Sequence, residues 1–533
     1  MHSNIHAVEI VFLLLLFFVV VFGVLARKLK TPYPIVLVIA GLLLSFIPGI
    51  PRISLNPDIV FFMILPPLLY AAAWTTSWRE FSNNLVSILL LAFGLVTFTV
   101  VGVSYACHWF FPGLDWRMGL VLGAVVAPTD AIAATSIASR IGLPKQIVQI
   151  LEGESLLNDA SALLALEFGV ALLVGEQKTG FVSGAGRFAY LTVVGILVGL
   201  VIGEIVHRVE HWIDDGPIEI ALSILTPYVA YLGAEALHAS GVLAVVVCGL
   251  YLGRKSSHFF SPNVRLQASA VWDSLTFILN GLVFVLIGLQ LPYILDAIRD
   301  HSRKELLLYG AAFSVFLIVL RLVWVYPGAH LAYFIRRRLL HHHEATPTRR
   351  EIFVVGWTGM RGVISLAAAI ALPQTLANGE PFTQRNMILF LTFSVILVTL
   401  VLQGLTLPPV IRGLGLAGAA DPSELPEEIE ARRQMVEAAL AHLEETRGDG
   451  EPNEITQELA KHYRRRLAEL EQEAEHNSSP DFMGYVNLSR ELLRVERQTA
   501  VRLRNQRQIS DELLRELERE LDLSETRLLE KRA

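Results

Sequence analysis

Long apolar segments of about twenty residues, separated by short polar stretches, follow one another through the first 413 residues of the chain. A helix of this length crosses the hydrocarbon core of a bilayer, whereas a soluble core does not need such segments in series. The pattern therefore predicts an all-α polytopic membrane protein with about thirteen transmembrane helices. These helices are expected at 8–26, 33–49, 57–73, 84–109, 116–138, 146–174, 187–208, 218–238, 241–253, 268–291, 305–334, 351–373 and 386–411.

The pattern changes after residue 413, where Glu, Arg, Leu and Gln dominate the chain. The stretches LPEEIEARRQMVEAALAHLEE and ITQELAKHYRRRLAELEQEAE place apolar residues three and four apart among charged ones, which is the spacing of amphipathic helices. We therefore predict a transmembrane domain over 1–413 and a charged helical domain over 414–533. Solvated helices that pack on one another explain the second pattern, and a regulatory or dimer-stabilising role is compatible with it.

Basic residues are unevenly shared between the two sets of loops that alternate along such a chain. Sixteen Lys and Arg fall in one set and eight in the other. Cytoplasmic loops carry the excess, so the first set and the tail are expected in the cytoplasm and the N-terminus outside, in an inner or plasma membrane. The first apolar segment is followed, not preceded, by Arg27, Lys28 and Lys30, and it is therefore expected to be a retained span.

Composition and net charge exclude fewer classes of function than the pattern of apolar segments does. The formal net charge is −6, and residues 413–533 supply the excess with 18 Lys and Arg against 27 Asp and Glu. No surface for nucleic acid is evident. Cys107 and Cys248 lie in different apolar segments and imply no disulfide framework. P-loop, dinucleotide-binding and metalloprotease motifs are all missing from the sequence, so no cofactor is expected.

The stretch LEGESLLNDASALLAL at 151–166 places polar residues inside an expected span. A charge near the centre of a bilayer costs roughly 2.5–3.5 kcal/mol on insertion scales, so such residues call for a functional or structural reason. Ser155 and Asp159 are four residues apart and share one helix face, and Glu154 and Asn158 share the adjacent face. The first face offers oxygen ligands, which suit a hard cation such as Na⁺.

Further polar groups lie in three other expected spans. In GAVVAPTDAIAA, Thr129 and Asp130 follow Pro128, which removes a backbone hydrogen bond and frees carbonyl groups as additional cation ligands. Many secondary transporters build their sites from such discontinuous helices. Arg321 lies in VLRLVWVYP and Arg361 in GWTGMRGVISLA.

The charges of these spans suggest an exchange mechanism. Three carboxylates against two guanidiniums leave one negative charge, which a proton or a monovalent cation must balance. A carboxylate that holds either H⁺ or Na⁺ exchanges one for the other, and Asp159 is the candidate. A purely structural interpretation also exists, in which Glu154 and Arg321 form an ion pair that only holds helices together.

Five motifs resemble the cation/proton antiporter-1 family, and in particular prokaryotic sodium/proton antiporters of the NhaP type. They are LPPLLY, VVAPTDAIAA, LEGESLLNDASALL, NGLVFVLIGLQL and GWTGMRGVISLA, in the order in which the family has them. The resemblance covers about residues 1–413. It implies a thirteen-helix protomer with an inverted repeat and discontinuous crossing helices, usually a homodimer, that exchanges monovalent cations for protons and is not an enzyme.

The resemblance also implies roles for individual residues. Asp159 would bind the ion and the proton, and Asp130, Ser155 and Thr129 would help to coordinate the ion. Asn158 stands where electrogenic relatives have a second aspartate, which implies electroneutral exchange of one H⁺ per Na⁺. The supporting residues would be the structural ion pair of Glu154 with Arg321 and the core arginine Arg361.

Other functions remain compatible with these residues. Potassium/proton exchange uses the same oxygen ligands, and Li⁺ is a further candidate ion. Asp130 and Asp159 also suggest an intramembrane aspartyl protease, although Ser155 and Asn158 crowd the surface that its catalytic water would need. A cation channel is the remaining alternative, and single-channel currents would distinguish it from a transporter.

Overall fold

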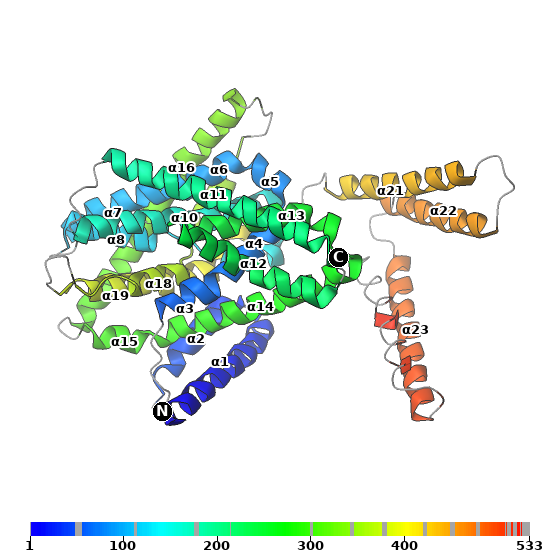
Figure 1. Ribbon diagram of the computed structural model, residues 1–533, viewed down its shortest axis with the longest axis horizontal. Helices are drawn as coiled ribbons and strands as arrows, with labels where there is room; N and C mark the ends of the chain where they lie inside the picture. The colour runs from blue at the N-terminus through cyan, green and yellow to red at the C-terminus, as the bar shows by residue number, and fades with distance from the viewer. Residues whose placement is uncertain are drawn as a thin grey trace. The chain divides into compact units, whose positions relative to one another are not determined.

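A computed structural model describes most of the chain as helices joined by short connections (Figure 1). The residues that it describes are 2–47, 56–110, 114–174, 181–213, 215–298, 302–339, 341, 346–375, 381–418, 424–447, 454–475, 480–506, 508, 513–514, 517, 520–522 and 524. Over these residues the only extended pairing is an isolated bridge between Thr375 and Pro381. The chain divides into two compact units, Met1–Ala420 and Asp421–Ala533.

The first unit is a bundle of apolar helices, and the prediction of an all-α membrane protein is confirmed. Within the part of the chain that the structure describes, ten helical stretches have the length and composition to cross a membrane, and α2 is a shorter apolar helix. The number thirteen stays a prediction. The helices are α1 (His2–Lys28), α2 (Tyr33–Leu44), α3 (Pro57–Ile59), α4 (Leu65–Thr75), α5 (Trp78–Asn83), α6 (Leu85–Leu89), α7 (Val96–Phe110), α8 (Trp116–Val126), α9 (Ala131–Ile141), α10 (Lys145–Val174), α11 (Phe181–Glu210), α12 (Gly216–Ala236), α13 (Gly241–Phe259), α14 (Pro262–Leu289), α15 (Leu291–Asp296), α16 (Arg303–Leu339), α17 (Arg349–Trp357), α18 (Val363–Ile370), α19 (Arg385–Val398) and α20 (Gly404–Gly413), with π-helical turns η1 (Val60–Ile64), η2 (Leu90–Leu95) and η3 (Thr399–Gln403).

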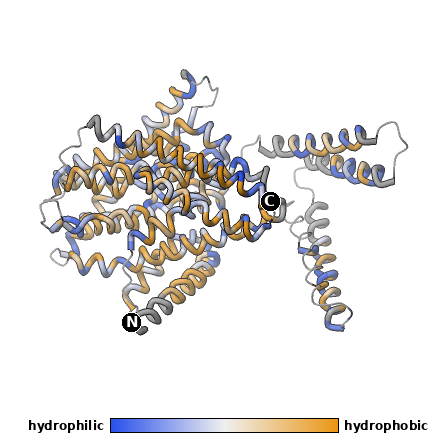
Figure 2. Tube along the Cα trace, viewed as in Figure 1, coloured by the Kyte–Doolittle hydropathy of each residue, from blue (hydrophilic) through white to orange (hydrophobic). Residues whose placement is uncertain are grey.

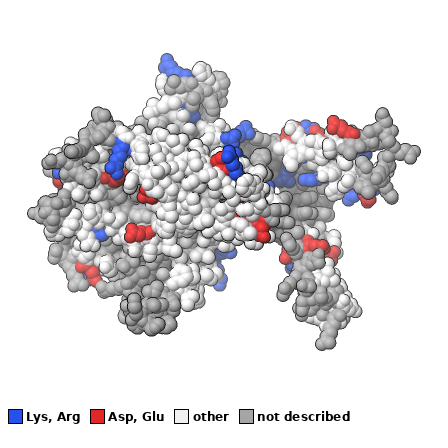
Figure 3. All heavy atoms as spheres, in the orientation of Figure 1, with Lys and Arg blue, Asp and Glu red and all other residues white. Residues whose placement is uncertain are grey.

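The outer surface of this unit carries many large apolar side chains. Figure 2 shows hydrophobic residues along most of its helices, and the face in Figure 3 has few charged side chains over the middle of the unit. Large side chains such as Trp109, Leu197 and Leu307 are well exposed. Such a surface fits hydrocarbon rather than water. Of the basic residues in the orientation count, Arg52, Lys178 and Arg299 lie outside the described residues.

Prolines and glycines shape the bundle locally. The π-helical turn η1 comes just before Pro66 and Pro67, which have no N–H group for a regular helical ladder. Helices α2 and α14 approach closely at two glycines. A Cβ on Gly41 would lie 2.3 Å from the carbonyl oxygen of Val285, and one on Gly288 would lie 2.4 Å from that of Val38. Only residues without a side chain allow this contact.

Two of the expected spans are interrupted. The span predicted over 116–138 consists of α8 and α9 with a break at residues 127–130, and the span over 351–373 consists of α17 and α18 with a break at 358–362. The backbone N–H of Asp130 in one break donates to the carbonyl of Met360 in the other, at 2.8 Å. The prediction of discontinuous crossing helices is therefore confirmed.

In the described part of the second unit there are three longer helices. Helices α21 (Glu424–Arg447) and α22 (Glu454–Glu475) lie side by side, and α23 (Pro480–Asn505) follows them. Arg433 pairs with Glu430 and Glu437 on the same helix, at 2.7 and 2.9 Å. These i,i+3 and i,i+4 pairs are typical of a solvated helix surface.

Candidate functional site

The break between α8 and α9 is held by polar contacts from both sides. Pro128 has no backbone N–H, so the helical ladder cannot continue through it. Asp130 then begins α9 as its N-cap, and its Oδ1 accepts from the N–H of Ile132 at 2.8 Å. Asp130 is thus fixed by its side chain to α9 and by its backbone to Met360 of the opposite break.

The second break depends on glycines that sequence reasoning did not single out. A Cβ on Gly362 would lie 2.6 Å from Oδ2 of Asp130, and one on Gly359 would lie 2.3 Å from the Cδ of Arg321. The backbone N–H of Arg361 donates to Thr399 Oγ1 at 3.1 Å, which ties the break to η3. The spacing of glycines in GWTGMRG was the available signal, because glycines at a break allow close approach of backbone and side chains.

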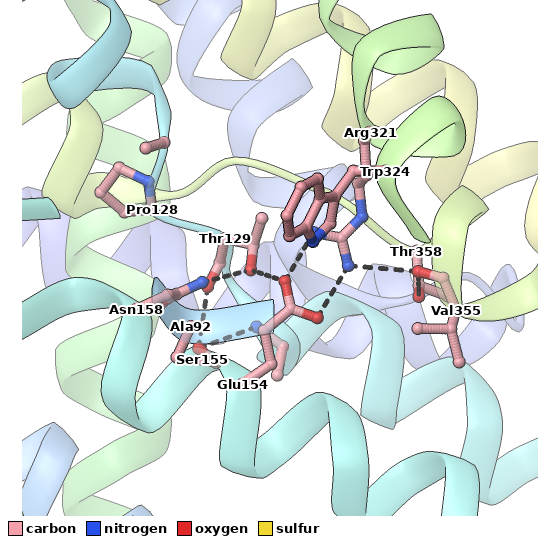
Figure 4. Close-up of polar contacts among 12 residues, drawn as sticks. Ala92, Pro128, Thr129, Glu154, Ser155, Asn158, Arg321, Trp324, Val355 and Thr358 are labelled. Atoms are coloured by element: carbon pink, nitrogen blue, oxygen red, sulfur yellow. Dashed lines mark hydrogen bonds and ion pairs between the residues drawn. The ribbon is translucent and has the colours of Figure 1, made fainter. Parts of the chain in front are cut away.

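Three side chains form a hydrogen-bonded row between α10 and the first break (Figure 4). Asn158 Nδ2 donates to Thr129 Oγ1 at 2.5 Å, and Thr129 Oγ1 donates to Glu154 Oε1 at 2.9 Å. All three residues are buried. The hydroxyl of Thr129 therefore contacts the face of α10 that bears Glu154 and Asn158.

Glu154 is paired with Arg321, as the structural interpretation of these charges predicts. Arg321 Nη1 lies 2.5 Å from Oε1 and Nη2 lies 2.8 Å from Oε2, so the pair is bidentate. Glu154 is 1% exposed and Arg321 is 2% exposed. Nη2 also donates to the carbonyl of Val355 at 3.1 Å, next to the second break.

Among the described residues, Arg361 forms no ion pair with a carboxylate, although its charge still counts in the sum of three carboxylates and two guanidiniums. Its Nη1 donates to the carbonyls of Ala127 at 2.9 Å and Pro128 at 3.4 Å. These are carbonyls at the C-terminal end of α8, where the helix dipole favours a cation. The guanidinium therefore stabilises the break itself.

Asp159 and Ser155 lie on the other face of α10. Ser155 Oγ donates to the carbonyl of Thr129 at 2.8 Å and accepts from the N–H of Ala131 at 3.4 Å, so it spans the break. Asp159 is 4% exposed and is close enough to Asp130 for their charges to interact. Among the described residues, the Asp159 carboxylate accepts no hydrogen bond and forms no ion pair. All eight residues named from the sequence thus lie at or beside the crossing.

Two discontinuous helices that cross beside buried carboxylates are the architecture of a secondary transporter. A family model described as "Sodium/hydrogen exchanger, transmembrane" matches residues 13–413. The chain belongs to this family, which is a family of transporters.

Curated proteins and solved structures agree with this assignment. The chain is 35% identical over 523 residues to an uncharacterised Na⁺/H⁺ exchanger of Mycobacterium tuberculosis H37Rv, covering 96% of this chain and 94% of that protein. It is 33% identical over 415 residues to the Na⁺/H⁺ antiporter ApNhaP of Aphanothece halophytica, covering 78% and 75%. The structure of the sodium proton antiporter MjNhaP1 from Methanocaldococcus jannaschii at pH 8 matches with a TM-score of 0.60 at 19% identity, covering 77% of this chain and 99% of that one, and it shows the same fold.

Proposed function

We propose that this protein is a secondary antiporter that exchanges Na⁺ for H⁺ by alternating access, with Asp159 as the group that binds either ion. The proposal rests on one observation. Asp159 is buried at the helix crossing without a countercharge among the described residues, whereas Glu154 in the same helix has Arg321. A buried carboxylate without a fixed partner needs a proton or a mobile cation.

The neighbouring groups suit a small hard cation. Asp130 adds a second carboxylate, Ser155 adds a hydroxyl oxygen, and Thr129 adds a backbone carbonyl at the break. These are the oxygen ligands that alkali and other hard cations prefer. Ser155 donates its proton to the Thr129 carbonyl, so the Ser155 oxygen retains acceptor capacity. Sodium would be bound here as the transported substrate.

The supporting residues keep their charge state through the cycle in this proposal. Glu154 is neutralised by Arg321, and Arg361 is bound to carbonyls of α8, so neither group exchanges ions. Asn158 is an amide hydrogen-bonded to Thr129, which leaves Asp159 as the carrier on α10. One carrier carboxylate exchanges one proton for one Na⁺, so exchange is electroneutral.

The names of the relatives indicate which monovalent cations are candidates for exchange with H⁺. The Bacillus pumilus relative, 33% identical over 454 residues, is named a sodium, potassium, lithium and rubidium/H⁺ antiporter. We propose Na⁺ as the main substrate, with Li⁺ and K⁺ as competitors to be tested. Membership in a transporter family weighs against the protease and channel alternatives.

The remaining parts of the proposal concern the assembly. We place the protein in the plasma membrane with the N-terminus outside and the C-terminal unit in the cytoplasm, according to the loop charges. We further propose that the protein is a homodimer and that residues 414–533 regulate it or stabilise the dimer. We also propose that it needs no cofactor and has no enzymatic activity. Crosslinking in native membranes and transport by a chain truncated after residue 420 would test the dimer and the tail.

The decisive experiment uses purified protein in proteoliposomes that contain a pH-sensitive dye. A pH gradient is imposed, Na⁺, Li⁺ or K⁺ is added, and the series is repeated with valinomycin and K⁺ to clamp the voltage. Dissipation of the gradient by Na⁺, unchanged under the clamp, is the expected result. A rate that depends on voltage would contradict the electroneutral stoichiometry, and no response to any cation would contradict antiport.

A further inference from the structure

The π-helical turn η2 contacts both helices that carry the buried ion pair. It interrupts the apolar stretch Leu85–Cys107, and it packs against α10, which holds Glu154, and against α16, which holds Arg321. A π-helical turn disturbs the regular hydrogen-bond ladder of a helix, and each carbonyl oxygen has two lone pairs. The carbonyls of such a turn are therefore able to accept from neighbouring helices, and single π-helical turns are frequent at functional sites.

Ser161 of α10 donates to one of these carbonyls. Its hydroxyl lies within hydrogen-bond distance of two carbonyl oxygens, that of Ala92 in η2 at 2.5 Å and that of Asn158 in its own helix at 3.0 Å. Ser161 is 3% exposed and Ala92 is 0% exposed, so the shorter contact joins two buried helical segments. Glu154, Asn158 and Ser161 follow the i, i+4, i+7 spacing of one helix face. Ser161 therefore continues the face of α10 that bears the hydrogen-bonded row (Figure 4).

Trp324 of α16 donates to the same turn. Its Nε1 lies 3.3 Å from the carbonyl oxygen of Leu90. The indole ring stacks on Phe98 with ring centroids 5.0 Å apart, and a Cβ on Gly94 in η2 would lie 2.6 Å from its Cζ2. Trp324 follows Arg321 by three residues, so the two side chains are neighbours on the surface of α16. The ring thus holds α16 against η2 next to the arginine of the ion pair.

Together with the ion pair, these two hydrogen bonds join three helical segments in a closed triangle. Ser161 binds α10 to η2, and Trp324 binds α16 to η2. The pair of Glu154 with Arg321 binds α10 to α16. Asp159 lies two residues before Ser161 in α10, so a shift of α10 along η2 moves its carboxylate as well. The groups of a binding site must be held within about 0.5 Å of the productive geometry by the residues around them.

We infer that Ser161 and Trp324 are positioning residues of the ion site, which use the carbonyls of η2 to fix α10 relative to α16 and thereby place the carboxylate of Asp159. Each acts through the backbone of η2 and not as a ligand of the ion. The inference rests on the antiport function proposed above, because it concerns the cation bound at Asp159. A displaced carboxylate changes the size of the cavity, so Na⁺ and Li⁺ are affected unequally.

Substitutions that remove only the hydrogen-bond donor test this role in proteoliposomes. Ser161→Ala should raise the KM for Na⁺ several-fold with little change in kcat, because the binding of the ion loses its geometry. It should also change the ratio of the KM values for Na⁺ and Li⁺. Ser161→Thr keeps the hydroxyl and should restore both values. The matched control is Ser314→Ala, because Ser314 is 0% exposed and its hydroxyl donates to Gly310 of its own helix at 2.7 Å.

Trp324→Phe removes the indole N–H, keeps an aromatic ring and should raise the KM for Na⁺ in the same way. Its control is Trp272→Phe, because Trp272 is 3% exposed and donates to Ser223 at 3.1 Å, away from the helix crossing. Loss of either bond opens the triangle, so the double variant should raise the KM by much less than the product of the two single effects. KM values equal to those of the controls, or single effects that multiply, would overturn the inference.

The melting temperature in detergent tests the triangle without a transport assay. The double variant of Ser161→Ala and Trp324→Phe should lower the Tm by less than the sum of the two single shifts, since both residues share η2 as their partner. Ser161→Ala combined with Trp272→Phe should give the sum. Additive shifts in both pairs would show that η2 does not couple the helices. A failed antiport function is distinguishable, because the unmodified protein would then show no cation response in proteoliposomes while the non-additive Tm shifts persist.

Discussion

Arg321 in α16 donates two parallel hydrogen bonds to Glu154 in α10, at 2.5 and 2.8 Å, across 167 residues of sequence. Both side chains are almost fully buried, so geometry and further hydrogen bonds must offset the cost of removing two charges from water. Thr129 donates to the carboxylate, and Val355 accepts from the guanidinium. The pair thereby connects α10 and α16 to both helix breaks.

Breaking this pair should destabilise the protein more than it impairs ion binding directly. Glu154→Gln leaves the Arg321 guanidinium buried without a countercharge, which costs about 3–5 kcal/mol. The melting temperature in detergent should fall clearly. Glu167→Gln is the matched control, because Glu167 pairs with Arg187 at the exposed surface of the same helix and such pairs contribute about 0–1 kcal/mol. Equal melting temperatures for the two variants would argue against a structural role of the buried pair.

Asp159→Asn should abolish exchange while the protein still folds and inserts. The substitution keeps the shape of the side chain and removes the only group that alternates between proton and cation in the proposed cycle. The readouts are the dye signal in proteoliposomes and a normal elution profile in detergent. Asp273→Asn, at an exposed acid in α14, should retain exchange. Residual Na⁺-driven proton movement near the wild-type rate would exclude Asp159 as the carrier.

Protons and Na⁺ should compete for the site. If both bind the same carboxylate, lowering the pH raises the apparent KM for Na⁺, by up to about tenfold per pH unit once the carboxylate is mostly protonated. The maximal rate at saturating Na⁺ should change much less over the same range. Initial rates at several pH values and Na⁺ concentrations measure this. A KM for Na⁺ that stays constant across the series would mean that the two ions use separate groups.

Gly362→Ala should impair the site through a steric contact. The new Cβ would lie 2.6 Å from Oδ2 of Asp130, so the carboxylate or the second break must move. Overpacking of this kind costs about 1–3 kcal/mol, and the rate of exchange at low Na⁺ should fall roughly tenfold or more. A Cβ on Gly413 would meet no atom within 4 Å, which makes Gly413→Ala the control. Wild-type exchange by Gly362→Ala would show that Asp130 need not hold its position.

Much of the fold followed from local features of the sequence. Apolar length predicts spans, and the spacing of polar residues predicts amphipathic helices, because both depend on residues within a few turns. Pro128 in GAVVAPTDAIAA marked the first break for the same reason. The candidate residues Asp159, Asp130 and Ser155 were likewise visible, since polar groups in apolar segments need an explanation.

Hydrogen-bond partners that are distant in sequence could not be predicted from such local features. The sequence named no partner for Arg361, and the structure shows that it binds the carbonyl of Ala127, 234 residues away in sequence. The Thr129 hydroxyl contacts Glu154 and Asn158, while its carbonyl contacts Ser155. Which donor meets which acceptor depends on how α8, α10 and α17 pack, and no local pattern records that packing.

The sequence by itself thus determined the membrane class, most of the long apolar helices and the set of ionisable groups, because hydrophobic length and charge are properties of short segments. Only the tertiary structure decided that the two breaks meet at Asp130 and Met360, that Arg361 stabilises helix α8, and that Asp159 has no fixed countercharge among the described residues. The physical reason is that a buried charge is balanced by whichever group the packing brings within a few ångströms, however distant that group is along the chain.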